Sequence, residues 1–134
     1  MDHKILSKAD YTLIFTFIGF FIFTGNMGRI TIISEFFRNV INDREFFISI
    51  IASQVISNVP ATLMLSGFAN NYRELIIGVN VGGLGTLIAS MASLISYKAY
   101  TKEYHDNTSQ YIIYFTMLNV LFLIPLIILW IFIH

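Results

Sequence analysis

Two stretches of this chain interrupt apolar segments: Ser57-Asn58-Val59-Pro60-Ala61 and Asn80-Val81-Gly82-Gly83-Leu84-Gly85-Thr86. Pro60 lacks a backbone N–H and disfavours the α conformation at Val59, while the glycines of the second stretch permit positive φ. Lipid offers no hydrogen-bond partners, so unwound backbone at membrane depth is tolerated only where it is buried or lines a cavity. The two stretches therefore predict broken helices of the kind that form ion and substrate sites in secondary transporters.

The composition favours a membrane protein. Hydrophobic residues make up 56% of the 134 residues and charged residues only 12%, with a mean hydropathy of +0.72. Eight basic and eight acidic residues cancel, which gives no reason to expect a nucleic-acid partner. Cysteine is absent, so disulfides, thiol catalysis and cysteine-ligated metals are excluded. With no nucleophile–base pair or metal cluster in reach, we expect neither an enzyme nor a cofactor.

The apolar pattern predicts an all-α polytopic membrane protein, with residues 1–134 forming one membrane domain. Residues 11–27 and 110–133 each suit a hydrocarbon core roughly 30 Å thick and predict crossing helices. No small-residue cleavage site follows the first of them, which we interpret as a membrane helix and not a removed signal peptide. Residues 31–42 reach only about 18 Å and alternate apolar pairs with polar residues, which predicts an amphipathic helix along the membrane interface.

Residues 45–71 admit two interpretations. They form either one kinked crossing helix or a re-entrant hairpin of two half-length pieces, 46–56 and 61–69, joined at 57–60. The positive-inside rule does not choose, because the eight basic residues divide four against four for a hairpin and three against five for a crossing helix. The residues alone leave both interpretations open.

Side chains near this segment predict two helix starts. Asn42 followed by Glu45 resembles a capping box for the helix that enters the segment. Asn58 suits the N-cap of the second piece, with Pro60 in its first turn.

Residues 75–97 predict a second broken helix, interrupted at 82–85. No Asp, Glu, Lys, Arg or His occurs from Phe46 to Asn71 or within 75–97, which disfavours proton transport by these residues. Glu74, next to Arg73, is expected to be exposed at an interface with a structural role.

Half-helices that meet inside a membrane supply two kinds of binding group. Freed carbonyls and neutral side-chain oxygens suit a small cation such as Na⁺, which would serve as a coupling ion, and helix N-termini suit an anion. The side chains expected to bind the cation are those of Ser57, Asn58, Asn80 and Thr86. The helix starts expected to face the anion lie at Pro60 and Ala61, and at 87–88.

Residues 53–61 read Ser-Gln-Val-Ile-Ser-Asn-Val-Pro-Ala, and residues 78–90 read Gly-Val-Asn-Val-Gly-Gly-Leu-Gly-Thr-Leu-Ile-Ala-Ser. Together they resemble the C-terminal half of the ion transporter superfamily, which includes divalent-anion/sodium symporters, citrate transporters and arsenite permeases. Each inverted repeat of that group carries a re-entrant hairpin with a Ser-Asn tip, then a helix unwound at a Gly-rich loop. The resemblance implies the hairpin, an N-terminus inside, a C-terminus outside and elevator-type alternating access.

The resemblance also implies roles for particular residues. It places Ser57, Asn58, Gly83 and Thr86 at a cation site. It implies that Asn58, Val59 and Pro60 face the anion, and Thr86 enters our anion set as well. In the dicarboxylate members the Ser-Asn pair is followed by Thr, whereas here it is followed by Val59 and Pro60, so a hydroxyl is missing. The proline is closer to the arsenite-permease and uncharacterised anion-permease branches.

We therefore expect the C-terminal part of a secondary transporter that moves a small anion, coupled to a cation. The alternatives are an arsenite-type oxyanion exporter and a small membrane subunit that does not transport. The expected partners are the lipid bilayer, the anion, and either the N-terminal half of the transporter or a second copy, because 134 residues are few for a two-half transporter. We expect a multi-pass protein in the cytoplasmic membrane of a prokaryote.

Overall fold

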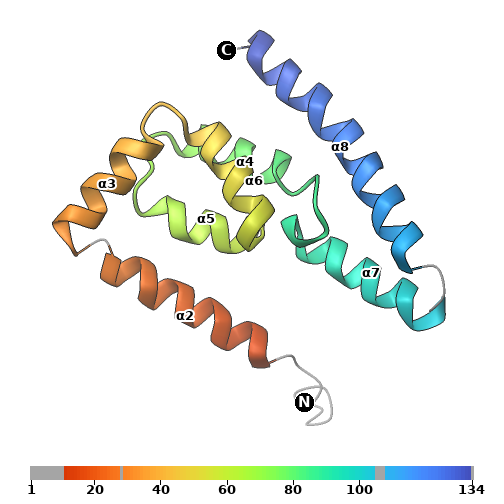
Figure 1. Ribbon diagram of the computed structural model, residues 1–134. Helices are drawn as coiled ribbons and strands as arrows, with labels where there is room; N and C mark the ends of the chain where they lie inside the picture. The colour runs from red at the N-terminus through yellow and green to blue at the C-terminus, as the bar shows by residue number, and fades with distance from the viewer. Residues whose placement is uncertain (1–10, 28, 105–107, 134) are drawn as a thin grey trace, which may run out of the picture.

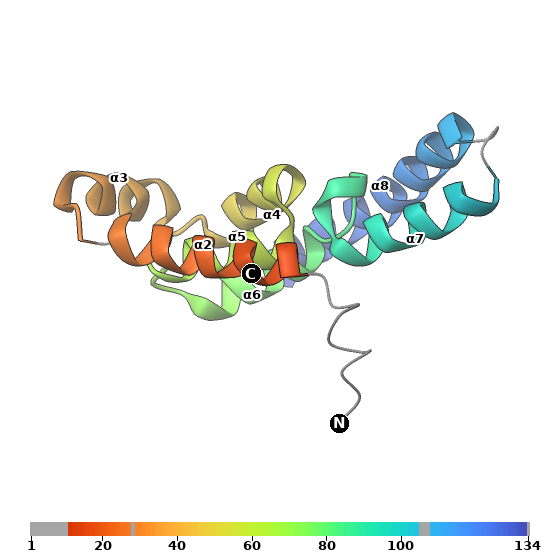
Figure 2. The same ribbon diagram turned by 90° about the horizontal axis from the view of Figure 1, so that it is seen from below.

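The computed structural model describes residues 11–27, 29–104 and 108–133. All regular elements in these ranges are helical, which confirms the predicted all-helical chain. They are α2 (Tyr11–Met27), α3 (Thr31–Ile41), α4 (Glu45–Ile56), α5 (Asn58–Ser66), α6 (Tyr72–Val81), the 3₁₀ turn η1 (Leu87–Ala89), α7 (Met91–Glu103) and α8 (Thr108–Ile133). The helices form a broad, thin layer with α4, α5 and α6 at its centre, as Figures 1 and 2 show.

The helices α4 and α5 form a hairpin. Ser57 is the one residue between them, and its dihedral angles, φ 73° and ψ 152°, turn the chain. At the open end, Oε1 of Glu45 accepts backbone N–H groups from Asn70 at 3.3 Å and Asn71 at 3.1 Å. The chain therefore returns after α5 to the point where α4 began, which a single kinked helix would not do.

The structure corrects both predicted caps and the length of the turn. The residue before α4 is Arg44, and Asn42 uses its Oδ1 to accept a hydrogen bond from the Asn70 amide at 2.8 Å. The residue before α5 is Ser57, so Asn58 is already helical. The turn between the two helices is thus one residue long, and not the four residues 57–60.

Small residues let α6 lie close against α4. A Cβ at Gly82 would stand 2.8 Å from Ile50 Cα, and one at Gly78 would overlap Ser49 Oγ. The hydroxyls of Ser49 and Ser53 donate to carbonyls of their own helix, so neither needs a partner on α6. Two glycines four residues apart thus face two serines four residues apart, a contact typical of closely packed membrane helices.

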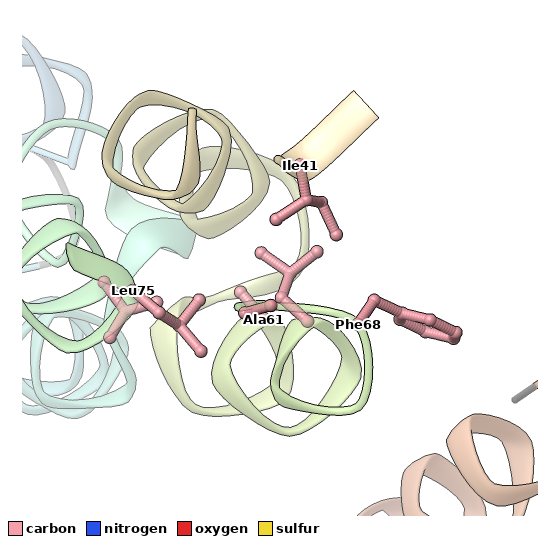
Figure 3. Packing of buried hydrophobic residues seen from close by; sticks show 7 residues of the cluster. Ile41, Ala61, Phe68 and Leu75 are labelled. Carbon is pink, nitrogen blue, oxygen red and sulfur yellow. The ribbon is translucent and has the colours of Figure 1, made fainter. Parts of the chain in front are cut away.

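A small apolar cluster joins α3, α5 and α6 (Figure 3). Its buried members are Ile41, Ala61, Leu65, Phe68, Ala69, Leu75 and Val79. Phe37 of α3 stacks on Phe68 with ring centroids 5.0 Å apart. On the same helix Ile32 is 81% exposed. The amphipathic helix therefore packs only part of its apolar surface against the hairpin.

The second break is longer than predicted. The helix α6 ends at Val81, and the chain forms only the turn η1 before α7 begins at Met91. Ser90 precedes α7 and its Oγ accepts the N–H of Ala92 at 3.2 Å. At the expected helix start, 87–88, only the 3₁₀ turn η1 begins, and the regular helix starts three residues further on because Ser90 caps it.

The helix α8 has 26 residues, and none of them is buried. In the described part of the chain it is the one helix that is long and apolar enough to cross a membrane by itself. The helices α2 and α3 meet that test only when taken together, across a bend of 102°. A long apolar helix with an open surface is the form expected of a lipid-facing span.

Candidate functional site

The turn of the hairpin and the break after α6 lie against each other. Gly83, in the break, approaches Asn58 at the start of α5 so closely that a Cβ at Gly83 would be 3.1 Å from Asn58 Nδ2. Ser57 precedes Asn58 and lines a cavity of about 340 Å³ together with Ile88 and Met91 from beyond the break. Two segments that interrupt different helices therefore meet at one place.

Gln54 joins these two segments. Its Nε2 donates to the carbonyl oxygens of Gly82 and Leu84, both at 2.8 Å, and its Oε1 accepts the N–H of Thr86 at 2.9 Å. The Thr86 hydroxyl in turn donates to the Gln54 carbonyl at 3.3 Å. One side chain on α4 thus binds three backbone groups of the break.

Gln54 is a residue of this region that the apolar and polar patterns did not predict. Its one signal is that it is the only amide side chain on α4, whose other residues after Glu45 are apolar or carry hydroxyls. Since buried polar groups are nearly always hydrogen-bonded, such an amide must pair with something, and a nearby segment rich in unwound backbone is the natural partner.

Gly85 fits this arrangement for two reasons. Its φ is +115°, a conformation that side chains with a Cβ rarely adopt. A Cβ at this position would also lie 2.5 Å from Gln54 Oε1. The glycine therefore permits both the turn of the break and the close approach of the amide.

Ser57 combines a buried hydroxyl with an unusual backbone conformation. The residue is 7% exposed, and its Oγ has no hydrogen-bond partner among the described residues. Its φ of 73° with ψ of 152° is a conformation nearly restricted to glycine, which costs about 1–3 kcal/mol in other residues. Strain and an unsatisfied polar atom at the same residue favour a site that a ligand completes.

The start of α5 offers few free donors to an anion. The N–H of Ala61 donates to the carbonyl of Ser57 at 3.0 Å, and Pro60 has none. The side chain of Ala61 is fully buried in the apolar cluster. The backbone donors left at this end of α5 are those of Asn58 and Val59, and the Val59 side chain is 42% exposed.

The remaining predicted ligands divide between the site and its surroundings. Asn80 is exposed, and its Nδ2 donates to the Ile76 carbonyl of its own helix at 2.8 Å. Thr86 is in the break, held by Gln54 through both its N–H and its hydroxyl. The structure therefore brings Ser57, Asn58, Gly83 and Thr86 to one region, while the amide nitrogen of Asn80 is engaged on α6.

Two buried carboxyl groups lie at the opposite end of the hairpin. Glu45 is 4% exposed and Glu74 is 8% exposed, so the expectation of an exposed Glu74 is wrong. Trp130 of α8 donates its indole N–H to Glu74 Oε2 at 2.6 Å, and both side chains line a pocket of about 210 Å³. The physical reason for the error is that α8 covers Glu74 from a position 56 residues away.

Two longer proteins are similar to this chain. A protein described as an uncharacterized transporter of Methanocaldococcus jannaschii is 44% identical over 89 residues, which cover 66% of this chain and 25% of the relative. The inner membrane protein YbiR of Escherichia coli is 33% identical over 99 residues, which cover 72% of this chain and 27% of the relative. The chain thus spans about a quarter of each. No family model and no solved structure matches it.

Proposed function

We propose that this chain is part of a membrane transporter and forms one half of its substrate site. The observation that carries the proposal is the buried hydroxyl of Ser57, which has no partner among the described residues and lies where the two broken segments meet. The name of the Methanocaldococcus jannaschii relative and the open, apolar α8 support a transport role in a membrane.

In this proposal the α4–α5 hairpin enters and leaves the membrane on one side. Its two helices have 12 and 9 residues, so each reaches roughly half of a 30 Å hydrocarbon core. The turn at Ser57 then lies near the midplane, where unwound backbone lines a site and is shielded from lipid.

The groups at the meeting point suit a cation and an anion together. The cation is proposed to bind the oxygens of Ser57, Asn58 and Thr86 with the carbonyl of Gly83, a hard and neutral set suited to Na⁺. The anion is proposed to face Asn58 and the first N–H groups of α5, where the helix dipole is positive. Such a pair of sites would couple anion movement to a sodium gradient, with elevator-type alternating access.

The substrate site would be completed by another chain segment. Because the chain spans about a quarter of its relatives, the N-terminal half of a transporter or a second copy would supply the remaining ligands. This partner would also cover part of the apolar surface that α8 exposes.

Uptake into membrane vesicles tests the proposal. Vesicles carrying the tagged chain with whatever copurifies would be given radiolabelled succinate, citrate, sulfate, phosphate or arsenite, with and without an inward sodium gradient. We expect sodium-driven uptake of one anion class, abolished by Ser57→Ala and Asn58→Ala at unchanged membrane levels. Asn119→Ala, which removes an amide that bonds within α8, is the matched control and should transport normally.

Each other result has a definite meaning. Sodium-independent efflux of arsenite would show that the protein is an oxyanion exporter and not a sodium-coupled symporter. Unchanged transport in Ser57→Ala and Asn58→Ala would show that the substrate site does not lie at the hairpin turn. An absence of transport in every preparation would favour a membrane subunit without transport activity.

A further inference from the structure

Gln54 is the one described side chain that binds the backbone of the break at several points. Its three partners, Gly82, Leu84 and Thr86, lie 28, 30 and 32 residues further along the chain. All three hydrogen bonds are 2.8 or 2.9 Å long, within the usual range for N–H···O bonds. The break is therefore held by a side chain of another helix.

We propose that Gln54 is the positioning residue of this site and fixes the 82–86 segment to the hairpin as one unit. A peptide-like amide is the group this task requires, because it donates two hydrogen bonds and accepts others from a single planar head. Glutamate would keep the acceptor oxygen and lose both donors. Methionine would fill a similar volume and lose all three hydrogen bonds.

The same hydrogen bonds select which backbone groups remain for a ligand, a step that rests on the proposed function. Gln54 occupies the carbonyls of Gly82 and Leu84. The carbonyl between them belongs to Gly83, the residue that packs against Asn58. Of these three carbonyls, that of Gly83 accepts nothing from Gln54, so it is the one proposed to face the cation, and Gln54 is not itself a ligand.

The packing around Gln54 argues that the hairpin and the break move together. Gly82 and Gly78 lie against α4, and Gly85 lies against the Gln54 amide itself. A change in the position of α4 would carry the break with it. A transporter built this way would keep its cation ligands in register through its conformational cycle.

Hydrogen–deuterium exchange tests the positioning role without any need for transport. The chain in lipid nanodiscs, with its copurifying partner, would be compared as wild type, Gln54→Met, Gln54→Glu and the matched control Gln110→Met on the exposed start of α8. We expect the Thr86 amide to be protected in the wild type although it lies outside a helix. In Gln54→Met its exchange should accelerate by at least about fivefold, the factor that one lost hydrogen bond supplies.

Amides that do not depend on Gln54 provide the internal reference. The N–H groups of Asn70 and Asn71, which bind Glu45, should exchange at the wild-type rate in every variant. Gln54→Glu loses both donated bonds but keeps the oxygen that accepts from Thr86, so its Thr86 amide should exchange more slowly than in Gln54→Met. Gln110→Met should change nothing.

A wild-type exchange rate at Thr86 in Gln54→Met would overturn the proposal, since methionine would then show that Gln54 only fills space. If Gln54→Met does not fold, Gln54→Leu, which also lacks the oxygen that accepts from Thr86, is judged by the same criterion. An unprotected Thr86 amide in the wild type would overturn the proposal without any variant. Suppose that the Thr86 amide exchanges faster in Gln54→Met than in the wild type, while the wild type transports no anion. This result would refute the proposed function and leave the positioning role standing.

Discussion

Trp130 of α8 donates its indole N–H to a carboxyl oxygen of Glu74 at 2.6 Å, across 56 residues of sequence. The same indole ring stacks on Phe46 at the start of α4, with centroids 4.0 Å apart and planes within 6°. One aromatic side chain thus fastens the long exposed helix to both α6 and the hairpin. Since α8 buries none of its residues, this contact is a principal attachment of α8 to the rest of the described chain.

The substitution Trp130→Phe should weaken that attachment selectively. Phenylalanine can still stack on Phe46 but cannot donate to Glu74, and removing a donor from a buried acceptor costs about 1–3 kcal/mol. We expect a lower melting temperature in detergent, measured by intrinsic fluorescence or calorimetry. Phe132→Leu, at a side chain that is 85% exposed, should melt as the wild type does. Equal melting of both variants would mean that the hydrogen bond does not hold α8.

The substitution Gly78→Ala should separate α6 from α4. The added methyl group would overlap Ser49 Oγ and lie 2.5 Å from the Phe46 carbonyl oxygen, so backbone has to move, at a cost of about 1–3 kcal/mol or more. Thermal unfolding and yield of folded protein measure the loss. Gly19→Ala on α2 meets nothing within 4 Å and should leave stability unchanged or raise it. A neutral Gly78→Ala would contradict the close contact.

The substitution Ser57→Gly should stabilise the chain while removing a proposed cation ligand. Glycine adopts φ near 73° without strain, so the gain is about 1–3 kcal/mol, less about 1 kcal/mol for the entropy of glycine in the unfolded chain. We expect a raised melting temperature together with lost anion uptake. Ser57→Ala removes the hydroxyl and keeps the strained Cβ, so it should lose uptake with little change in melting. A lower melting temperature for Ser57→Gly would show that the turn is not strained.

Thiol labelling should show whether the hairpin re-enters the membrane. The chain has no cysteine, so single substitutions report without background. Asp43→Cys and Tyr72→Cys, both at exposed positions beside the open end of the hairpin, should react with a membrane-impermeant maleimide from the same side. Glu103→Cys, at the end of α7, should react from the other side. Opposite sides for the first two would show that residues 45–71 cross the membrane.

Sequence reasoning located the breaks but not the contacts that hold them. Pro60 and the glycines of the 82–85 segment are local signals, because each changes what its own backbone can adopt. The lengths of the breaks were less predictable. The first turn is Ser57 alone and is shorter than expected, whereas the second break extends to Ser90, which caps α7. Which residue caps a helix depends on competition between local hydrogen bonds, and the pattern of apolar residues does not show which of these bonds forms.

The residues that sequence reasoning missed act over long distances. Glu45 and Glu74 sit at helix ends, where charged side chains usually meet solvent, and only the return of the chain and the arrival of α8 bury them. Gln54 is equally hidden, because its partners are backbone atoms that carry no side-chain signature. Pairing across 25 to 56 residues is a property of the folded arrangement and not of any single segment.

The hydrogen bonds of Gln54, the Glu45 contacts with Asn70 and Asn71, and the glycine contacts of α6 all fall within residues 45–90. None of these contacts needs a residue of α8, so this stretch can assemble as one unit before α8 packs against it. The bond between Glu74 and Trp130 can form only after α8 has been translated. Folding would then pass through a state in which the two broken segments are already in contact but the hydrogen bond from Trp130 to Glu74 has not yet formed.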